Sequence, residues 1–319
     1  MMIRKKKSMT LKYVIVFLLI IPISTHSLIF IVSADSNYNI DFEKGTQVLE
    51  VKKYNDQIWQ NTVSITSNPS DWLGGDADKI GAKSKITLLW WGGNDIIAYS
   101  LFKNLIIPQI FSNITSYGYN YSYISDNYPY YYFVWEYGFH YWVFTTKEFN
   151  DNPDNFDEIL YILEEPQNYS KLLNDYNDFA GKINNDTTLQ LLGYTIPIYN
   201  GDDLLWQFIV SRFALAKPVE EYLTIFTEII GCENVSIQEN SLVFQRSGEK
   251  NYSVEVTYNN QGLIDRFVVK DSEGYIFYEI TSSYPKIIFY IILGIIAISV
   301  LGLATLVMIK KIKLNKQFR

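Results

Sequence analysis

The stretch Tyr252-Ser-Val-Glu-Val-Thr-Tyr-Asn-Asn-Gln-Gly-Leu-Ile-Asp-Arg-Phe-Val-Val-Lys270 decides the fold class. Apolar and polar residues alternate before the run Asn259–Gly262, which is rich in turn-forming residues, and a second apolar segment follows it. Alternation with a period of two indicates strands, and the turn residues between them indicate a hairpin. Neighbouring segments of the same kind predict an antiparallel meander with strands at Ser236, Leu242–Gln245, Tyr252–Tyr258, Leu263–Lys270 and Tyr275–Thr281.

The segments before this meander are first β-rich and then helical. Strands are predicted at 46–53, at 85–91 and 96–102 around a hairpin turn at 92–95, and at 130–137 and 139–144 around Gly138. Helices are predicted at 156–165, 170–183, 202–215 and 218–230. The order β, then α, then β favours an α+β fold with helices against one face of an antiparallel sheet.

Both ends of the chain carry an apolar segment beside basic residues. Residues 1–34 combine a basic start with an apolar stretch and Val32-Ser33-Ala34, which predicts a cleaved signal peptide, with an uncleaved signal anchor as the alternative. Residues 286–309 contain the uncharged run Ile287–Ile309, long enough for a membrane helix, and 310–319 form a basic tail. We therefore expect a single-pass protein of the cell membrane with its domain 35–285 outside and its C-terminus cytoplasmic.

The predicted outer domain is strongly acidic. Eleven of the 27 basic residues lie in 1–34 and 286–319, where no acidic residue occurs, so 35–285 holds 16 basic and 34 acidic residues. This balance argues against nucleic acid as a partner. Cys232 is the only cysteine, which points to a prokaryotic surface because no disulfide can staple the domain. Six N-glycosylation sequons lie in this domain and suggest an archaeal glycoprotein, at Asn113, Asn120, Asn168, Asn185, Asn234 and Asn251.

Aromatic residues are densest between 111 and 146. Read as a strand, Tyr117, Tyr119, Tyr121 and Tyr123 would share one face. Together with Trp135 and Trp142, these tyrosines form a candidate platform for stacking on sugar rings or holding an apolar ligand. The alternative is that these aromatic side chains simply fill the core.

Clustered carboxylates at Asp71, Asp76 and Asp78 form a candidate Ca²⁺ site of irregular geometry, although the spacing excludes an EF-hand. Ordinary loop acids are the alternative interpretation. No catalytic motif accompanies them. His140 is the one histidine of the predicted outer domain and lies in an apolar strand, as a structural histidine would. An enzyme, assisted by carboxylates or by a metal, is therefore the least favoured of the possible functions.

Two segments of the chain resemble those of a known class of proteins. The run Tyr252–Phe267 followed by Gly274-Tyr-Ile-Phe-Tyr-Glu-Ile, and the loop Trp72-Leu-Gly-Gly-Asp-Ala-Asp-Lys, resemble uncharacterised archaeal cell-surface proteins with a signal segment, a β-rich ectodomain and one C-terminal membrane helix. The resemblance covers about a third of the chain and implies no activity. At the level of fold alone, the meander is also similar to lipoprotein-type half-barrels that hold lipid.

These observations predict a membrane-anchored cell-surface binding or adhesion protein that meets an extracellular protein, glycan or lipid. The alternative is a lipid- or glycan-binding ectodomain with an apolar pocket between the sheet and the helices. A large internal apolar pocket would favour the alternative. A closed core with an exposed apolar patch would favour surface binding.

Overall fold

The computed structural model describes residues 38–40, 45–96, 98–129, 131–211 and 214–283. The predicted signal segment 1–34, membrane helix 286–309 and tail 310–319 lie outside these residues. Within the described ranges, none of the helices combines the length and the apolar character needed to cross a bilayer.

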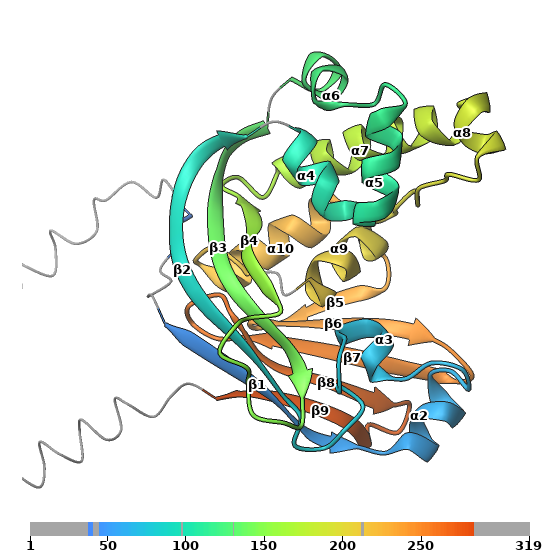
Figure 1. Ribbon diagram of the computed structural model, residues 1–319. Coiled ribbons are helices and arrows are strands. Elements are labelled where there is room, and N and C mark those ends of the chain that lie inside the picture. Colours follow the sequence, from blue (N-terminus) through green and yellow to red (C-terminus); the bar gives the residue numbers. More distant parts are fainter. Residues whose placement is uncertain (1–37, 41–44, 97, 130, 212–213, 284–319) are drawn as a thin grey trace, which may run out of the picture. The chain divides into compact units, whose positions relative to one another are not determined.

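One antiparallel sheet of nine strands organises the described part of the chain (Figure 1). Its strand order is β4-β3-β2-β1-β9-β8-β7-β6-β5, so β1 joins an N-terminal group of strands to the C-terminal meander. The strands are β1 Thr46–Tyr54, β2 Lys83–Ile96, β3 Tyr131–Thr145, β4 Asn155–Leu163, β5 Val235–Gln238, β6 Ser241–Ser247, β7 Asn251–Tyr258, β8 Ile264–Asp271 and β9 Ile276–Ser283. The predicted α+β class and the predicted meander are confirmed.

Helices occupy the segments between β1 and β3 and between β4 and β5. They are α2 Asp56–Thr62, α3 Pro69–Leu73, α4 Ala98–Leu105, α5 Pro108–Ser116, α6 Tyr121–Asn127, α7 Asn168–Asn184, α8 Thr187–Leu191, α9 Gly201–Val210 and α10 Val219–Ile229. The predicted helices at 170–183 and 218–230 are confirmed as α7 and α10. The helix predicted at 202–215 is confirmed as α9, which ends earlier, at Val210.

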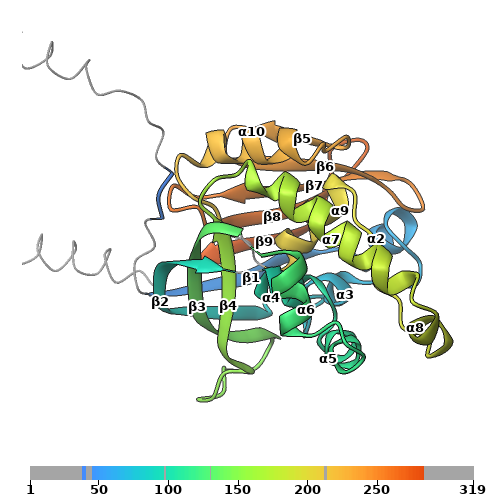
Figure 2. The same ribbon diagram turned by 90° about the horizontal axis from the view of Figure 1, so that it is seen from above.

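The sheet has an inner and an outer face. The inner face packs against the helices, with α7, α9 and α10 lying along the concave side of the curved sheet (Figures 1 and 2). Trp206 of α9, for example, contacts Phe244 and Phe267 of the meander at ring-centroid distances of 5.5 and 6.4 Å. The outer face of the meander instead carries ion pairs, such as Arg266–Glu279 at 2.7 Å. Burial of one face only explains the alternating pattern of β7.

Two local predictions in the first half of the chain are wrong. Gly92–Asp95 forms no hairpin turn, because β2 runs through it to Ile96 in register with β3. The segment expected to return as a strand is α4, whose buried residues Ala98, Leu101, Phe102 and Leu105 follow helical spacing. The predicted pair of strands around Gly138 is the single strand β3.

Two further predictions for the segment 117–165 are wrong. The four alternating tyrosines do not form a strand, because α5 ends before Tyr117 and α6 begins at Tyr121, capped by the side chain of Asn120. The helix predicted at 156–165 is β4, which pairs with β3 and buries Leu160 and Ile162. Ladder pairing with the preceding strand β3 outweighs the local helical pattern there.

Candidate functional site

The loop 67–80 is built around α3, whose first turn uses one of the three candidate metal ligands. The Asn68 side chain accepts a hydrogen bond from Ser70 N at 2.8 Å, and the Asp71 carboxylate accepts one from Asn68 N at 2.8 Å. This reciprocal arrangement is a capping box. Asp71 therefore serves the start of α3.

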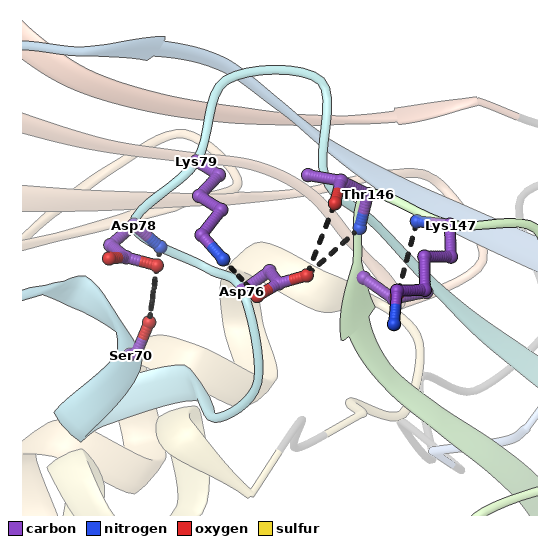
Figure 3. A network of polar contacts seen from close by, with 7 residues as sticks. Ser70, Asp76, Asp78, Lys79, Thr146 and Lys147 are labelled. Atoms are coloured by element: carbon purple, nitrogen blue, oxygen red, sulfur yellow. Dashed lines mark hydrogen bonds and ion pairs between the residues drawn. The ribbon is translucent and has the colours of Figure 1, made fainter.

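Asp76 fastens the same loop to the end of β3 (Figure 3). Its carboxylate accepts hydrogen bonds from Lys79 Nζ at 2.7 Å and from Thr146 N at 3.1 Å, and its backbone N–H donates to Phe144 O at 2.7 Å. The hydrogen bond from Lys79, followed by that from Thr146, lowers the pKa of Asp76 below its usual value of 3.8. Gly75 makes this approach feasible, since a Cβ atom there would stand 2.2 Å from Phe144 O.

Asp78 turns toward a different partner. Its Oδ1 accepts a hydrogen bond from Ser70 Oγ at 3.0 Å, and Ser70 Oγ accepts one from Asp78 N at 3.2 Å (Figure 3). Asp71, Asp76 and Asp78 thus bind three separate sets of protein donors. Among the residues that the structure describes, no group of three or more acidic, histidine or cysteine side chains is arranged to hold a metal ion.

A surface pocket of about 270 Å³ lies beside this loop, between Gly75–Asp76, the end of β3 and the β3–β4 loop. Two hydrogen bonds fold the β3–β4 loop over the strand, one from Trp142 Nε1 to Asn150 O at 3.0 Å and one from Val143 N to Asp154 Oδ2 at 2.8 Å. The lining mixes Trp142 and Phe149 with the charged groups Asp76, Lys147, Glu148 and Asp154. Such a wall suits a small polar molecule better than an acyl chain.

The predicted aromatic platform is not assembled at one place. Tyr117 and Tyr121 are exposed at 50% and 57%, whereas the half-buried Tyr119 and Tyr123 pack edge to face at 5.0 Å. The Tyr119 hydroxyl donates to Asp186 Oδ2 at 3.1 Å and so ties the α5–α6 turn to α8.

The two predicted tryptophans lie on opposite faces of β3. Trp135 belongs to the inner core, whereas Trp142 is buried outside that core by the β3–β4 loop. Lys85 Nζ lies 3.5 Å above the Trp142 ring. The expectation that aromatic strands fill the core therefore holds for Trp135.

The structure exposes a second group of aromatic side chains that was not predicted from the sequence. Trp90 and Trp91 are exposed at 37% and 44% and form what we call the aromatic rim, and Phe156 of β4 is exposed at 59%. Trp90 lies across Gly138 of β3, where a Cβ atom would stand only 2.2 Å from the Trp90 ring. A glycine in the middle of an aromatic strand was the available signal, because it marks the close approach of another group.

The six sequon asparagines all lie at the surface. Asn120, Asn185, Asn234 and Asn251 are exposed, and Asn113 and Asn168 are half-buried. None of the six lies on β1, β2, β3 or β4. Asn120 caps α6 through Oδ1, so a glycan on its Nδ2 would leave the cap intact.

Cys232 and His140 both lie in packed surroundings. Cys232 packs against the core, and burial followed by the charge of Asp202 raises its pKa to about 12. A thiol with this pKa is a poor nucleophile. His140 is half-buried between the rings of Trp142 and Phe156, at centroid distances of 6.3 and 5.7 Å, as expected of a structural histidine.

The described core holds two small cavities, and an open pocket of about 190 Å³ lies at the end of α9, lined by Phe139, Tyr141, Asn155, Glu158 and Val210. A cavity of about 20 Å³ lies among Leu49, Ile209, Phe267 and Ile280, and another of about 10 Å³ lies beside Gln47 and Tyr137. A single water needs about this much room. Comparison with models of protein families, with curated proteins and with solved structures finds no match to this chain.

Proposed function

We propose that this chain is a membrane-anchored cell-surface binding protein that meets its partner on the surface of an α+β ectodomain. One observation carries the proposal: the cavities enclosed in the described core are of water size, while Trp90, Trp91 and Phe156 stand exposed at the surface. Exposed aromatic groups of this kind mark interaction surfaces.

The charge pattern supports the same proposal. Residues 35–285 hold 34 acidic and 16 basic residues, and both basic flanks favour the cytoplasmic side of a membrane. The sequons lie on exposed or half-buried positions, as glycan acceptors on a displayed surface would.

A ligand-binding ectodomain is the second candidate. The pocket of about 270 Å³ beside Trp142 favours it, with room for a monosaccharide-sized molecule and with both aromatic and charged groups in the wall. An internal lipid site is less well supported, because the two cavities in the described core are far smaller than the roughly 300–1,000 Å³ of typical ligand pockets.

Cysteine labelling tests the membrane topology. In a Cys232→Ala background, Ser272→Cys places a thiol in the exposed β8–β9 turn and Lys316→Cys places one near the C-terminus. A membrane-impermeant maleimide should label Ser272→Cys on intact cells and Lys316→Cys only after permeabilisation. Equal labelling of both thiols on intact cells would refute a single span with a cytoplasmic tail.

Native mass spectrometry of the full chain, released from detergent, separates the two candidates. Surface binding predicts a chain that carries glycan mass and no retained small molecule. A reproducible added mass of lipid or sugar size would favour the ligand-binding alternative. If that added mass is lost in Asp154→Ala, which frees the β3–β4 loop from Val143 N, it lies in the surface pocket.

A further inference from the structure

We infer that Trp90 and Trp91 contact the lipid–water interface of the membrane in which the chain is anchored. The inference rests on the proposed anchoring by 286–309 and deepens it, because it assigns the part of the domain that faces the bilayer. It starts from the place where the described chain ends.

Strand register places the end of β9 level with Lys85 of β2, with β1 between the two strands. Val48 of β1 pairs with Ser283 on one side and with Lys85 on the other, so these three residues form one row across the sheet. Because β2 and β9 are both antiparallel to β1, they run in the same direction. The part of β2 beyond Lys85 therefore extends in the same direction as the chain that leaves the end of β9.

Two distances can be measured from that row: the distance along β2 to Trp90, and the distance along the chain after β9 to the predicted membrane run. Trp90 lies five residues beyond Lys85 and so about 17 Å further along the strand. The predicted membrane run begins at Ile287, four residues beyond Ser283, which an extended chain spans in at most about 14 Å. The aromatic rim therefore extends as far as the level at which the hydrocarbon region begins, within an interfacial layer about 5–8 Å thick.

The rim has the form that an interfacial contact needs. Thr46, the first residue of β1, pairs with Thr87 of β2, and Leu88 N donates a hydrogen bond to Gly45 O. Among the described residues, β2 therefore runs on past β1 at Trp90 and Trp91. The two side chains point to opposite faces of this protruding strand, and both are exposed. Tryptophan is enriched at membrane interfaces because its ring is apolar and its indole N–H is polar.

The charge of the domain near the aromatic rim indicates which lipid headgroups it can contact. Glu136 and Glu158 lie on strands β3 and β4 beside the rim, and the predicted outer domain is acidic overall. The contact must then rest on aromatic burial among neutral headgroups, since anionic headgroups would be repelled. Two of the six sequons fit this orientation, because α5 and α8, beside Asn113 and Asn185, lie on the opposite side of the domain from the bend of β2 in both views (Figures 1 and 2).

Tryptophan fluorescence gives a direct test, because all seven tryptophans lie between 59 and 206 and none lies in the predicted membrane segments. The full chain is reconstituted in phosphatidylcholine vesicles with or without acyl chains brominated near the headgroup. We expect bromolipid to quench part of the tryptophan emission, and we expect Trp90→Phe/Trp91→Phe to lose that quenching. Adding phosphatidylserine should not increase it.

The matched control is Trp206→Phe, which removes a half-buried tryptophan that packs against Arg246 and Phe244 and should keep the lipid quenching. Circular dichroism checks that each variant is folded. If the chain floats with the vesicles but aqueous acrylamide, and not bromolipid, quenches Trp90 and Trp91, the inference is overturned while anchoring stands. A chain that fails to float after a carbonate wash overturns the proposed anchoring and this inference with it.

Discussion

Buried tyrosine hydroxyls show how single atoms set the energetics of this core. Tyr222 donates its hydroxyl hydrogen bond to Leu163 O at 2.6 Å, where β4 ends, and Tyr169 accepts one from Leu163 N at 3.2 Å. Tyr258 lies close by with its hydroxyl buried and, within the described residues, without a hydrogen-bond partner. Burial raises the pKa of both Tyr222 and Tyr258 well above the usual value, so both hydroxyls stay neutral.

This contrast predicts opposite effects for one chemical change. Tyr222→Phe should lower the free energy of unfolding by about 1–3 kcal/mol, because Leu163 O loses its donor. Tyr258→Phe removes a hydroxyl that is desolvated without compensation and should raise the free energy of unfolding by about 1 kcal/mol. Urea unfolding of the full chain measures both values. Equal destabilisation by the two variants would show that Tyr258 has a partner.

The lowered pKa of Asp76 makes the stability of the folded chain depend on pH. Because its pKa is lowered in the folded state, its stabilising effect is complete above the unfolded value of 3.8 and is lost as pH falls through the folded pKa. Asp76→Asn should therefore be less stable than the natural chain at neutral pH, and the difference should shrink as the pH falls below 3.8 and vanish below the folded pKa. Thermal unfolding across this range checks the sign. A difference that grows on acidification would contradict it.

At the scale of elements, caps determine where helices begin. Asn200 begins α9 by accepting a hydrogen bond from Asp203 N at 2.8 Å, and this helix then crosses the meander with Leu204, Leu205 and Phe208 buried. The Asn200 cap also fixes the position of α9 on the sheet, because a frayed first turn would move the buried apolar residues of the helix off the sheet.

We expect Asn200→Ala to lower the free energy of unfolding by about 1 kcal/mol. Asn200→Asp is the matched control, since aspartate also caps and its charge suits a helix N-terminus. Chemical denaturation followed by circular dichroism distinguishes the two variants. Equal loss in both would mean that the side-chain amide, and not the accepted hydrogen bond, holds α9.

At the scale of the whole molecule, the sheet is continuous through β1. This strand pairs with β2 on one side and with β9 on the other, and Val51 of β1 pairs with the buried Ile280 of β9. The two groups of strands therefore share one hydrophobic core and should unfold together.

Ile280→Ala tests this coupling. The variant should lose about 2–5 kcal/mol of stability by leaving a cavity, with tryptophan fluorescence and circular dichroism reporting one coincident transition. Ile65→Ala is the control at a side chain that is 72% exposed, and it should change little. Two separated transitions in Ile280→Ala would mean that the N-terminal and C-terminal strand groups unfold independently.

The candidate site was only partly predictable. The acidic loop was recognised from its composition, yet the partners that engage Asp71, Asp76 and Asp78 come from backbone and side chains as distant as Thr146. The aromatic rim was missed because Trp90 and Trp91 read as ordinary strand residues. Their exposure depends on how far β1 extends beside β2, which is a property of pairing between segments about forty residues apart.

The sequence by itself determined the α+β class, the strands of the meander and helices α7, α9 and α10, because alternation and helical spacing are written in consecutive residues. Only the tertiary structure decided that Gly92–Asp95 continues a strand, that Asn155–Leu163 pairs with β3, and that the alternating tyrosines lie in the α5–α6 turn and the start of α6. Those segments have local patterns that suit more than one conformation. The free energy that selects one comes from ladder hydrogen bonds and burial against residues remote in the chain.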